Sequence, residues 1–238
     1  MIFVEGFLTP VPTASKQAYL EHASSAVDLF KRFGVTRFVE TWGDDVSNGK
    51  TNDLKQSVRL EIGETVLFSW FEYPDRATRD AAHKKMMADP AMAEMGKNMP
   101  FDGKRMIYGG FDAILDTGAA VKPGYVDGYV LPVPDARKQD YLTLAHKMAL
   151  KFKDYGALRV VECWGADVPD GKLTDYNRAT LKESGESVVY SWVEWPDKAT
   201  RDAGWQRMMA EDAAQGEPMP FDGKRMMWGG FEPILDER

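Results

Sequence analysis

The chain has 238 residues, of which 44% are hydrophobic and 28% are charged, and its formal net charge is −7. An acidic chain is poorly suited to neutralise nucleic-acid phosphates or anionic lipid headgroups, so we expect no nucleic-acid and no membrane partner. The single cysteine, Cys163, excludes an internal disulfide and a cysteine-rich zinc site. A secretory signal and an apolar run of about 18 residues are both missing, which predicts a soluble, cytoplasmic protein.

The first half of the chain is predicted to have the element order β-α-β-β-α-β. Residues 2–8 alternate in hydrophobicity, as a strand with one buried face does. The helix that follows is expected to begin with Thr13 as its N-cap and to end at Gly34, because glycine favours left-handed backbone. The further elements expected are a strand over 37–42, a polar turn over 44–53, a strand over 57–73 with a break near residue 63, a helix begun by Pro74-Asp75 and ending near residue 88, a loop or short turn over 92–98, and a last strand over 104–115.

The second half repeats this plan. The octapeptide MPFDGKRM occurs at Met99–Met106 and again at Met219–Met226, and the 18-residue blocks that begin with it are identical at 14 of 18 positions. Elsewhere an offset of 122 residues aligns the halves, so that Asp135 is the expected N-cap and Gly156 the expected end of the equivalent helix. We therefore expect a first domain over 1–116, a linker over 117–123 and a second domain over 124–238.

The strands of each half are apolar on both faces. In the second strand, Phe38 and Trp42 point to one side and Val39 to the other. A four-stranded sheet whose helices cover one face still exposes its other face, and that face must also be buried. Two such sheets packed face to face would close a barrel-like interior within one chain.

Four long motifs carry a resemblance to a known family. The segments VEGF, VETWGDDV, FSWFEYPDRATRDAAHKKMM and MPFDGKRMIYGGF, and their counterparts in the second half, closely resemble the YbaA-like family, domain of unknown function 1428. The resemblance implies an α+β fold of two tandem ferredoxin-like (βαββαβ) domains, whose antiparallel sheets pair as an intrachain dimeric α+β barrel. It implies a pseudo-dimer that exists as a monomer or a weak homo-oligomer, and it implies no particular activity.

Four glutamates each share a strand face with a tryptophan two residues away. The pairs are Glu40–Trp42, Trp70–Glu72, Glu162–Trp164 and Trp192–Glu194. A carboxylate in an aromatic, poorly hydrated cavity has a raised pKa and can act as a general acid or base. Glu40 and Glu162 are therefore the candidate catalytic residues, and the other members of the pairs are candidate ligand contacts. In the alternative interpretation these glutamates line the sheet edge or form ion pairs with Arg37, Arg59 or Arg105.

The repeated octapeptide supplies further candidate ligand contacts. Asp-Gly favours a tight turn, and the two basic residues after it point in opposite directions, so one of them could bind a carboxylate or an enolate. These candidates are Asp102, Lys104 and Arg105 in the first half and Asp222, Lys224 and Arg225 in the second. The alternative is that the aspartate caps the turn and pairs locally with the basic residues.

The remaining motifs predict neither a metal site nor a cofactor. None of the three histidines, at positions 22, 83 and 146, has a histidine at the equivalent position of the other half, which disfavours a symmetric histidine-based catalyst. Two interpretations of function remain open. The first is a small-molecule-binding barrel, with cofactor-independent enzymes that use carboxylate acid/base chemistry included in this class. The second is a non-catalytic structural or stress-related module whose barrel is filled by its own side chains.

Overall fold

The computed structural model describes residues 1–118, 121–212 and 218–238. The first half contains β1 (Phe3–Pro12), η1 (Thr13–Ser15), α1 (Lys16–Phe33), β2 (Arg37–Asp45), α2 (Leu54–Ser57), β3 (Glu64–Tyr73), α3 (Arg76–Ala88), α4 (Pro90–Met95) and β4 (Ile107–Gly118). The second half contains β5 (Tyr125–Pro134), η2 (Asp135–Arg137), α5 (Lys138–Asp154), β6 (Arg159–Asp167), α6 (Tyr176–Ala179), β7 (Glu186–Trp195), α7 (Lys198–Asp212), η3 (Gly223–Arg225) and β8 (Met227–Glu237).

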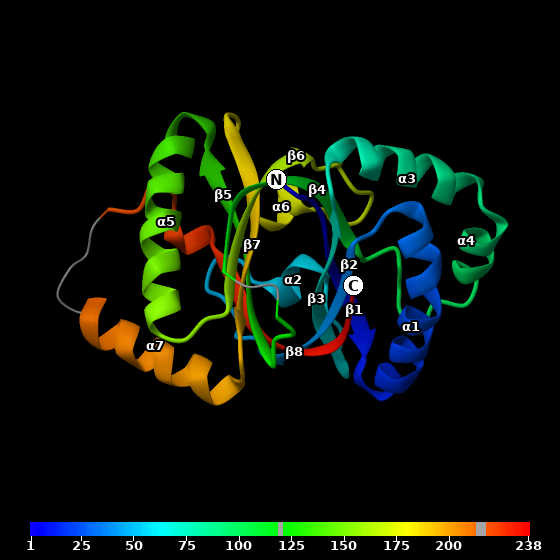
Figure 1. Cartoon of the computed structure of the whole chain (residues 1–238), viewed down its shortest axis with the longest axis horizontal. Helices are drawn as coiled ribbons and strands as arrows, with labels where there is room; N and C mark the ends of the chain where they lie inside the picture. The colour runs from blue at the N-terminus through cyan, green and yellow to red at the C-terminus, as the bar shows by residue number, and fades with distance from the viewer. Residues whose placement is uncertain (119–120, 213–217) are drawn as a thin grey trace.

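The strands close into one antiparallel barrel in the order β1-β3-β2-β8-β5-β7-β6-β4. Each half contributes four neighbouring strands, and the pairs β2–β8 and β4–β6 join the two halves. Helices α1, α3 and α4 cover one side of the barrel, and α5 and α7 cover the other (Figure 1). The predicted fold of two tandem ferredoxin-like units that pair within the chain is therefore confirmed.

Several local predictions are confirmed and others are wrong. Gly34 ends α1 with a φ of 111°, and Asp75 caps α3 by accepting a hydrogen bond from the backbone N–H of Thr78 at 2.7 Å. Thr13 does not cap α1, because its hydroxyl donates to the carbonyl of Gly63, and Asp135 instead accepts a hydrogen bond from Ser187. The expected strand over 57–73 begins only at residue 64, and the last strand of the half begins at residue 107 rather than 104. Residues 119 and 120 of the predicted linker lie outside the described residues.

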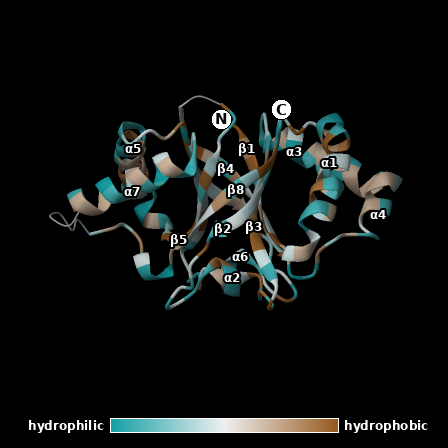
Figure 2. Cartoon of the chain, turned by 90° about the horizontal axis from the view of Figure 1, so that it is seen from below, coloured by the Kyte–Doolittle hydropathy of each residue, from teal (hydrophilic) through white to brown (hydrophobic). Residues whose placement is uncertain are grey.

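The short helix α2 and the segment after it precede β3 where the sequence predicted the start of the third strand. Its Leu54 and the following Val58 are fully buried, and Tyr176 of α6 is buried at the equivalent place in the second half. Both short helices lie at one end of the barrel, below the strands (Figure 2). They close that end because their apolar side chains extend the barrel core, a role that the alternation of the sequence did not reveal.

Side chains from both halves fill the barrel interior. Phe68 stacks on Tyr190 with ring centroids 4.3 Å apart, and the rings of Trp70 and Trp192 lie 4.5 Å apart. Val39 belongs to this interior, whereas Phe38 and Trp42 pack toward the helices, as expected from strand alternation. The interior is thus a packed core that joins the two halves.

The glycines of the repeated VEGF/VDGY motif make room for aromatic rings of the opposite half. A Cβ atom at Gly6 would lie 2.8 Å from the ring of Tyr190, and one at Gly128 would lie 2.6 Å from the ring of Phe68. We expect Gly6→Ala to lower the free energy of unfolding by about 1–3 kcal/mol, because the stacked rings cannot move without disturbing the core. Urea denaturation would measure this loss.

Gly96→Ala is the matched control for this substitution. Gly96 has a helical φ of −68°, and the nearest atoms to an added Cβ are 3.6 Å away. The control should leave stability unchanged or raise it slightly. An unchanged denaturation midpoint for Gly6→Ala would show that Tyr190 does not require the glycine.

Candidate functional site

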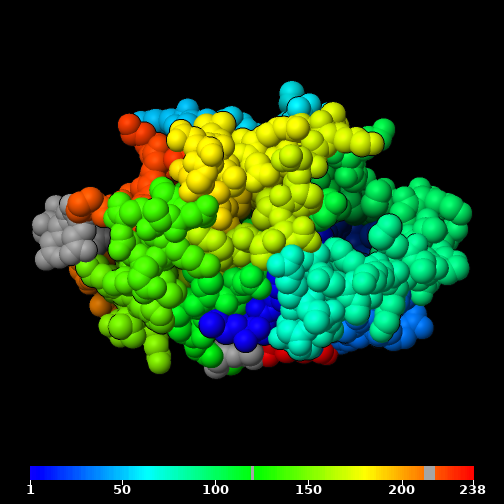
Figure 3. All heavy atoms as spheres, turned by 90° about the horizontal axis from the view of Figure 1, so that it is seen from above, coloured from blue at the N-terminus to red at the C-terminus, as the bar shows by residue number. Residues whose placement is uncertain are grey.

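A pocket lies between the outer face of the first-half sheet and the helices α1, α3 and α4. Its volume is about 490 Å³, which falls in the usual range for small-molecule sites. In Figure 3 the surface is hollowed beside the first-half helices, and dark-blue atoms from the start of the chain are visible at depth. The pocket is therefore separate from the packed barrel interior.

Most of the pocket wall is apolar. The aromatic contributors come from the strands, α1 and the repeated octapeptide, and the methionines come from α3, α4 and the segment after them. They are Phe7, Phe30, Phe38, Phe71, Phe101, Tyr19, Tyr108, Met86, Met87, Met92, Met95, Met99 and Met106. Unbranched methionine side chains adapt their shape to what they contact, so this wall can adjust to an apolar ligand.

Glu40 supplies one polar group of the pocket. This side chain projects from β2 and is only 6% exposed. Its Oε2 atom accepts hydrogen bonds from the hydroxyl of Tyr19, at 2.7 Å, and from the hydroxyl of Ser69. Burial raises the pKa of Glu40 to about 7, against the effect of these two hydrogen bonds. The carboxyl group can therefore hold or release a proton near neutral pH.

Glu5 on β1 supplies the second carboxyl group. The hydroxyl of Tyr73 donates to its Oε2 at 2.9 Å, and Nε2 of His83 lies 2.5 Å from its Oε1. The hydrogen bond to Glu5 raises the pKa of His83. The buried carboxylate therefore favours the charged imidazolium form of His83.

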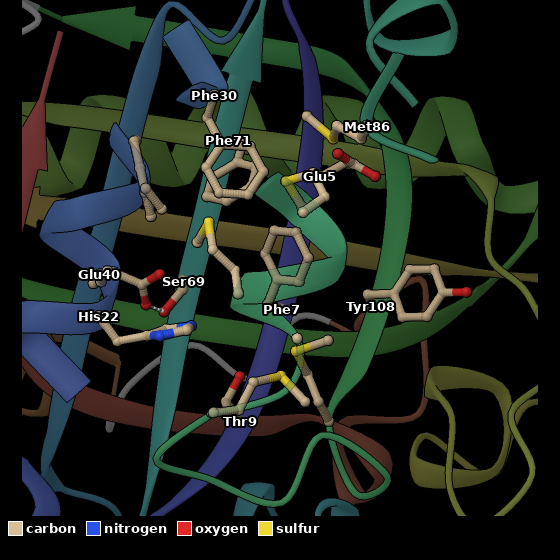
Figure 4. A pocket seen from close by; sticks show the side chains of 18 of the residues that line it. Glu5, Phe7, Thr9, His22, Phe30, Glu40, Ser69, Phe71, Met86 and Tyr108 are labelled. Atoms are coloured by element: carbon tan, nitrogen blue, oxygen red, sulfur yellow. Dashed lines mark hydrogen bonds between the residues drawn. The ribbon is translucent and has the colours of Figure 1, made fainter. Parts of the chain in front are cut away.

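The two carboxyl groups face the pocket from different sides. β3 lies between their strands, and Glu5 is paired with Phe71, two residues along β3 from Ser69. Strand spacing and rise place the backbone positions of Glu5 and Glu40 roughly 12 Å apart. The rings of Phe7 and Phe71 lie between them (Figure 4). A ligand of two or three rings could therefore contact both ends.

The equivalent region of the second half contains a tryptophan side chain. Glu162 keeps the arrangement of Glu40, since it accepts a hydrogen bond from Tyr141 at 2.5 Å and burial raises its pKa to about 7. At the position of His83, however, the second half has Trp205, which stacks on Trp228 with ring centroids 5.8 Å apart. The two halves thus share a fold but differ where the first half has its pocket.

The tryptophan–glutamate pairs of the sequence prediction lie on two different faces of the barrel wall. Trp70 and Glu72 point into the barrel, where the indole N–H donates to the carboxylate at 3.1 Å, and Trp192 and Glu194 repeat this at 3.0 Å. Each pair shares a strand face, as predicted. The carboxylate of Glu72 also accepts a hydrogen bond of 2.7 Å from the guanidinium of Arg159. These four residues belong to the interior and do not line the pocket.

The pairs Glu40–Trp42 and Glu162–Trp164 face the helices instead. The ammonium group of Lys16 lies 5.0 Å from the ring centre of Trp42, and that of Lys138 lies 4.6 Å from the ring centre of Trp164. Neither tryptophan is among the residues that line the first-half pocket. Among the residues of the predicted tryptophan–glutamate pairs, Glu40 therefore lines the first-half pocket.

The octapeptide residues form a local clamp in each half. Arg105 donates to Glu64 at 2.7 and 2.8 Å, to Asp102 at 2.9 Å and to the carbonyl of Arg59 at 3.0 Å. This clamp holds the turn after α2, where Arg59 has a φ of 50°. Lys104 is exposed. The geometry favours the structural interpretation of this ion cluster over that of a ligand anchor.

The second half repeats the clamp. Arg225 donates to Glu186 at 2.7 and 2.8 Å, to Asp222 at 3.3 Å and to the carbonyl of Leu181 at 2.9 Å, and Lys224 is exposed. Other residues of the first-half octapeptide, Met99, Phe101 and Met106, line the pocket. The repeated string therefore combines a folding role with a contribution to the pocket wall.

Sequence reasoning missed Glu5, His83 and Ser69. The glutamate does share a strand face with Phe3 and Phe7, but this alternation alone does not distinguish it from a surface residue. The sequence favours a surface helix position for His83. The difference between His83 and its counterpart Trp205 is the signal that could have pointed to the site. Within the described residues, no group of three or more histidine, cysteine, aspartate or glutamate side chains is placed to hold a metal ion. Those residues also include no helix both long and apolar enough to cross a membrane.

An eight-stranded barrel closed by two fused βαββαβ units, with a pocket between sheet and helices, defines a dimeric α+β barrel protein within a single chain. The chain belongs to the family described as "Protein of unknown function (DUF1428)", which matches residues 2–103 and 124–223. It is 54% identical to the uncharacterized protein YbaA of Escherichia coli K12 over 116 residues, which is 49% of this chain and 99% of that relative. The chain thus carries two copies of a unit that this relative has once.

Solved structures share the fold. A protein of Fusobacterium nucleatum described as a "putative monooxygenase" aligns with a TM-score of 0.58 and 10% identity, over 100% of this chain and 94% of that chain. One from Lactobacillus acidophilus with the same description aligns with a TM-score of 0.54 and 9% identity, over 99% of this chain and 95% of that chain. At these identities the similarity concerns the fold alone.

Proposed function

We propose that this protein binds an apolar small molecule in the pocket of its first half. The observation that carries the proposal is a cavity of about 490 Å³ whose wall is aromatic and methionine-rich and holds two buried carboxyl groups. A small-molecule site typically combines such an apolar wall with a few polar groups that orient the ligand. A purely structural module would have no need to keep Glu5 and Glu40 beside an unfilled cavity.

Glu40 is the candidate acid/base group of this site. Its pKa of about 7 suits proton transfer near neutral pH, and the hydrogen bonds from Tyr19 and Ser69 orient its carboxyl group. A cofactor-independent reaction that begins with proton transfer to or from a bound organic compound would use this group. Glu162 keeps the same local arrangement and is the corresponding candidate of the second half.

Replacing His83 by tryptophan should fill the end of the pocket beside Glu5 without disturbing the fold. The second half already carries tryptophan at this position, so the fold accommodates the side chain there. We expect the unmodified protein to bind one molecule of Nile red, a neutral planar dye without N–H or O–H donors. The His83→Trp variant should bind it at least about tenfold more weakly, because the indole occupies the space. Fluorescence titration of the dye measures both affinities.

His146→Trp is the matched control. His146 lies exposed on α5, so the same chemical change is made away from the pocket. The control should bind the dye as the unmodified protein does. Absence of saturable dye binding in the unmodified protein, or equal binding by His83→Trp, would contradict the proposed site and favour a non-catalytic, structural role.

A further inference from the structure

The second half holds an aromatic ring where the first half has its pocket. The indole N–H of Trp205 donates to Asp127 at 2.9 Å. Its ring stacks on Trp228 with an interplanar angle of 26°, and the ring of Phe152 packs against it at 6.2 Å. Trp205 therefore has one carboxylate acceptor and two aromatic neighbours.

The first half keeps the counterpart of every one of these partners. The offset of 122 residues places Glu5 at the position of Asp127 and Phe30 at that of Phe152, and the offset of 120 residues in the repeated block places Tyr108 at that of Trp228. All three line the pocket. The indole is replaced by the smaller imidazole of His83, which contacts Glu5 at 2.5 Å. The acidic and aromatic neighbours are thus present in the first half around a smaller ring than the indole.

Glu5, the equivalent carboxylate of the first half, can accept more hydrogen bonds than the described residues donate to it. Asp127 accepts three from side chains, namely those of Trp195, Arg201 and Trp205. Glu5 accepts two from the described residues, from Tyr73 and His83. A carboxylate has about four lone-pair sites, so Glu5 can accept a further bond from a group in the pocket.

We propose that the pocket binds a flat aromatic compound whose N–H or O–H group donates to Glu5 and whose ring stacks on Tyr108. In this arrangement the ligand lies beside the His83 ring, in space that the larger indole of Trp205 takes up in the second half. The remaining pocket, toward Glu40, accommodates an apolar extension of the ring. This inference rests on the proposed function, and it adds the chemical class of the ligand.

A pair of compounds that differ only at the donor tests the inference. 2-Phenylindole has the N–H group, and 1-methyl-2-phenylindole has the same rings without it. We expect one 2-phenylindole per chain, bound at least about tenfold more tightly than the methylated compound, because the latter leaves the acceptor on Glu5 unpaired. Glu5→Met should reduce this ratio to within about twofold, because it removes the acceptor. Isothermal titration calorimetry gives the affinities and the stoichiometry.

A double variant tests the same idea if Glu5→Met fails to fold. His83→Trp fills the Glu5 end of the first pocket, and adding Trp205→Ala opens the corresponding space in the second half. The double variant should bind one indole per chain and should bind 1-methylindole at least about tenfold more weakly, because Asp127 is the acceptor there. His83→Trp alone should bind neither compound. Equal binding of the two compounds by the double variant would overturn the comparison between the halves.

The outcomes separate the two proposals. If Nile red binds and His83→Trp blocks it, but both phenylindoles bind the unmodified protein equally, the pocket is a ligand site and the inferred donor is wrong. If Nile red and both phenylindoles fail to bind, the proposed function and the inference both fail. A donor preference that survives Glu5→Met would assign the hydrogen bond to another group and overturn the inference.

Discussion

Arg37→Met is expected to lower the free energy of unfolding by about 3–5 kcal/mol. Arg37 is 3% exposed inside the barrel, where it donates two hydrogen bonds of 2.9 Å to Asp236 and one of 2.7 Å to Glu194. Removing the guanidinium takes from two buried carboxylates their nearest cation and leaves them only longer contacts, of 3.5 Å from Arg159 to Glu194 and 3.9 Å from Arg238 to Asp236. Desolvated charges that lose a close partner are strongly destabilising. Urea denaturation followed by tryptophan fluorescence measures the loss, since Trp70 lies near this arginine.

The buried ion pairs around Arg37 link the two halves of the chain. Arg37 of the first half donates to Glu194 and Asp236 of the second half and, at 3.3 Å, to Glu72 of its own half. Arg159 of the second half donates to Glu72 and Asp116 of the first half and also lies 3.5 Å from Glu194. We therefore expect the unmodified chain to unfold in one transition. Arg159→Met should cost a similar amount, and the two losses should not add, because the arginines share partners.

An exposed ion pair provides the control for Arg37→Met. The side chains of Arg137 and Asp140 are 50% and 59% exposed. Arg137→Met should change the free energy of unfolding by less than about 1 kcal/mol. If Arg37→Met costs no more than this control, the buried network does not hold the barrel together, and separate transitions for the halves would contradict their coupling.

Glu40→Gln should remove a pH dependence of stability. Burial raises the pKa of Glu40 from 4.5 to about 7 in the folded protein. The folded state therefore keeps a proton that the unfolded state releases, so stability due to this group is present below pH 4.5 and is lost as the pH rises to about 7. A shift of this size corresponds to about 3 kcal/mol. Glutamine mimics the protonated acid at every pH, so the variant should be more stable than the parent at pH 8 by up to this amount.

The measurement is the free energy of unfolding in urea at several pH values between 5 and 8. Glu162 shares the raised pKa of about 7, so the double variant Glu40→Gln/Glu162→Gln should flatten the profile further. Glu94→Gln, at an exposed pair with Lys97, should leave the profile unchanged. A Glu40→Gln profile parallel to that of the parent would show that Glu40 is ionised throughout and would remove it as the acid/base candidate.

The fold could be predicted from the sequence because its signals are local and occur twice. The alternation of residues 2–8, the glycines at helix ends and the turn of the repeated octapeptide each follow from short-range geometry. The strand expected between residues 57 and 63 was wrong because Val58 is buried at the end of the barrel rather than along a sheet. The sequence indicates that an apolar residue is buried, but it does not indicate which other residues it packs against.

The candidate site could be predicted only in part. Alternation correctly placed Glu40 with Trp42 and Glu72 with Trp70, but it did not show that the two glutamates face opposite sides of the barrel wall. That difference depends on which face of each strand meets the helices, and hence on the pairing of strands that are far apart in the chain. The partners of Arg105 could not be predicted for the same reason, since Glu64 lies 41 residues away in the sequence yet binds it directly.

The amino-acid sequence alone established two copies of one βαββαβ unit, the apolar faces that make them pair, and the family to which they are similar. These properties follow from periodicity and repetition, which need no knowledge of distant contacts. The pocket beside Glu5 and Glu40 became apparent only from the packed chain. The same holds for the way Trp205 packs in the equivalent space of the second half. A cavity is the volume that side chains from several elements leave unfilled, so it depends on all of their positions together.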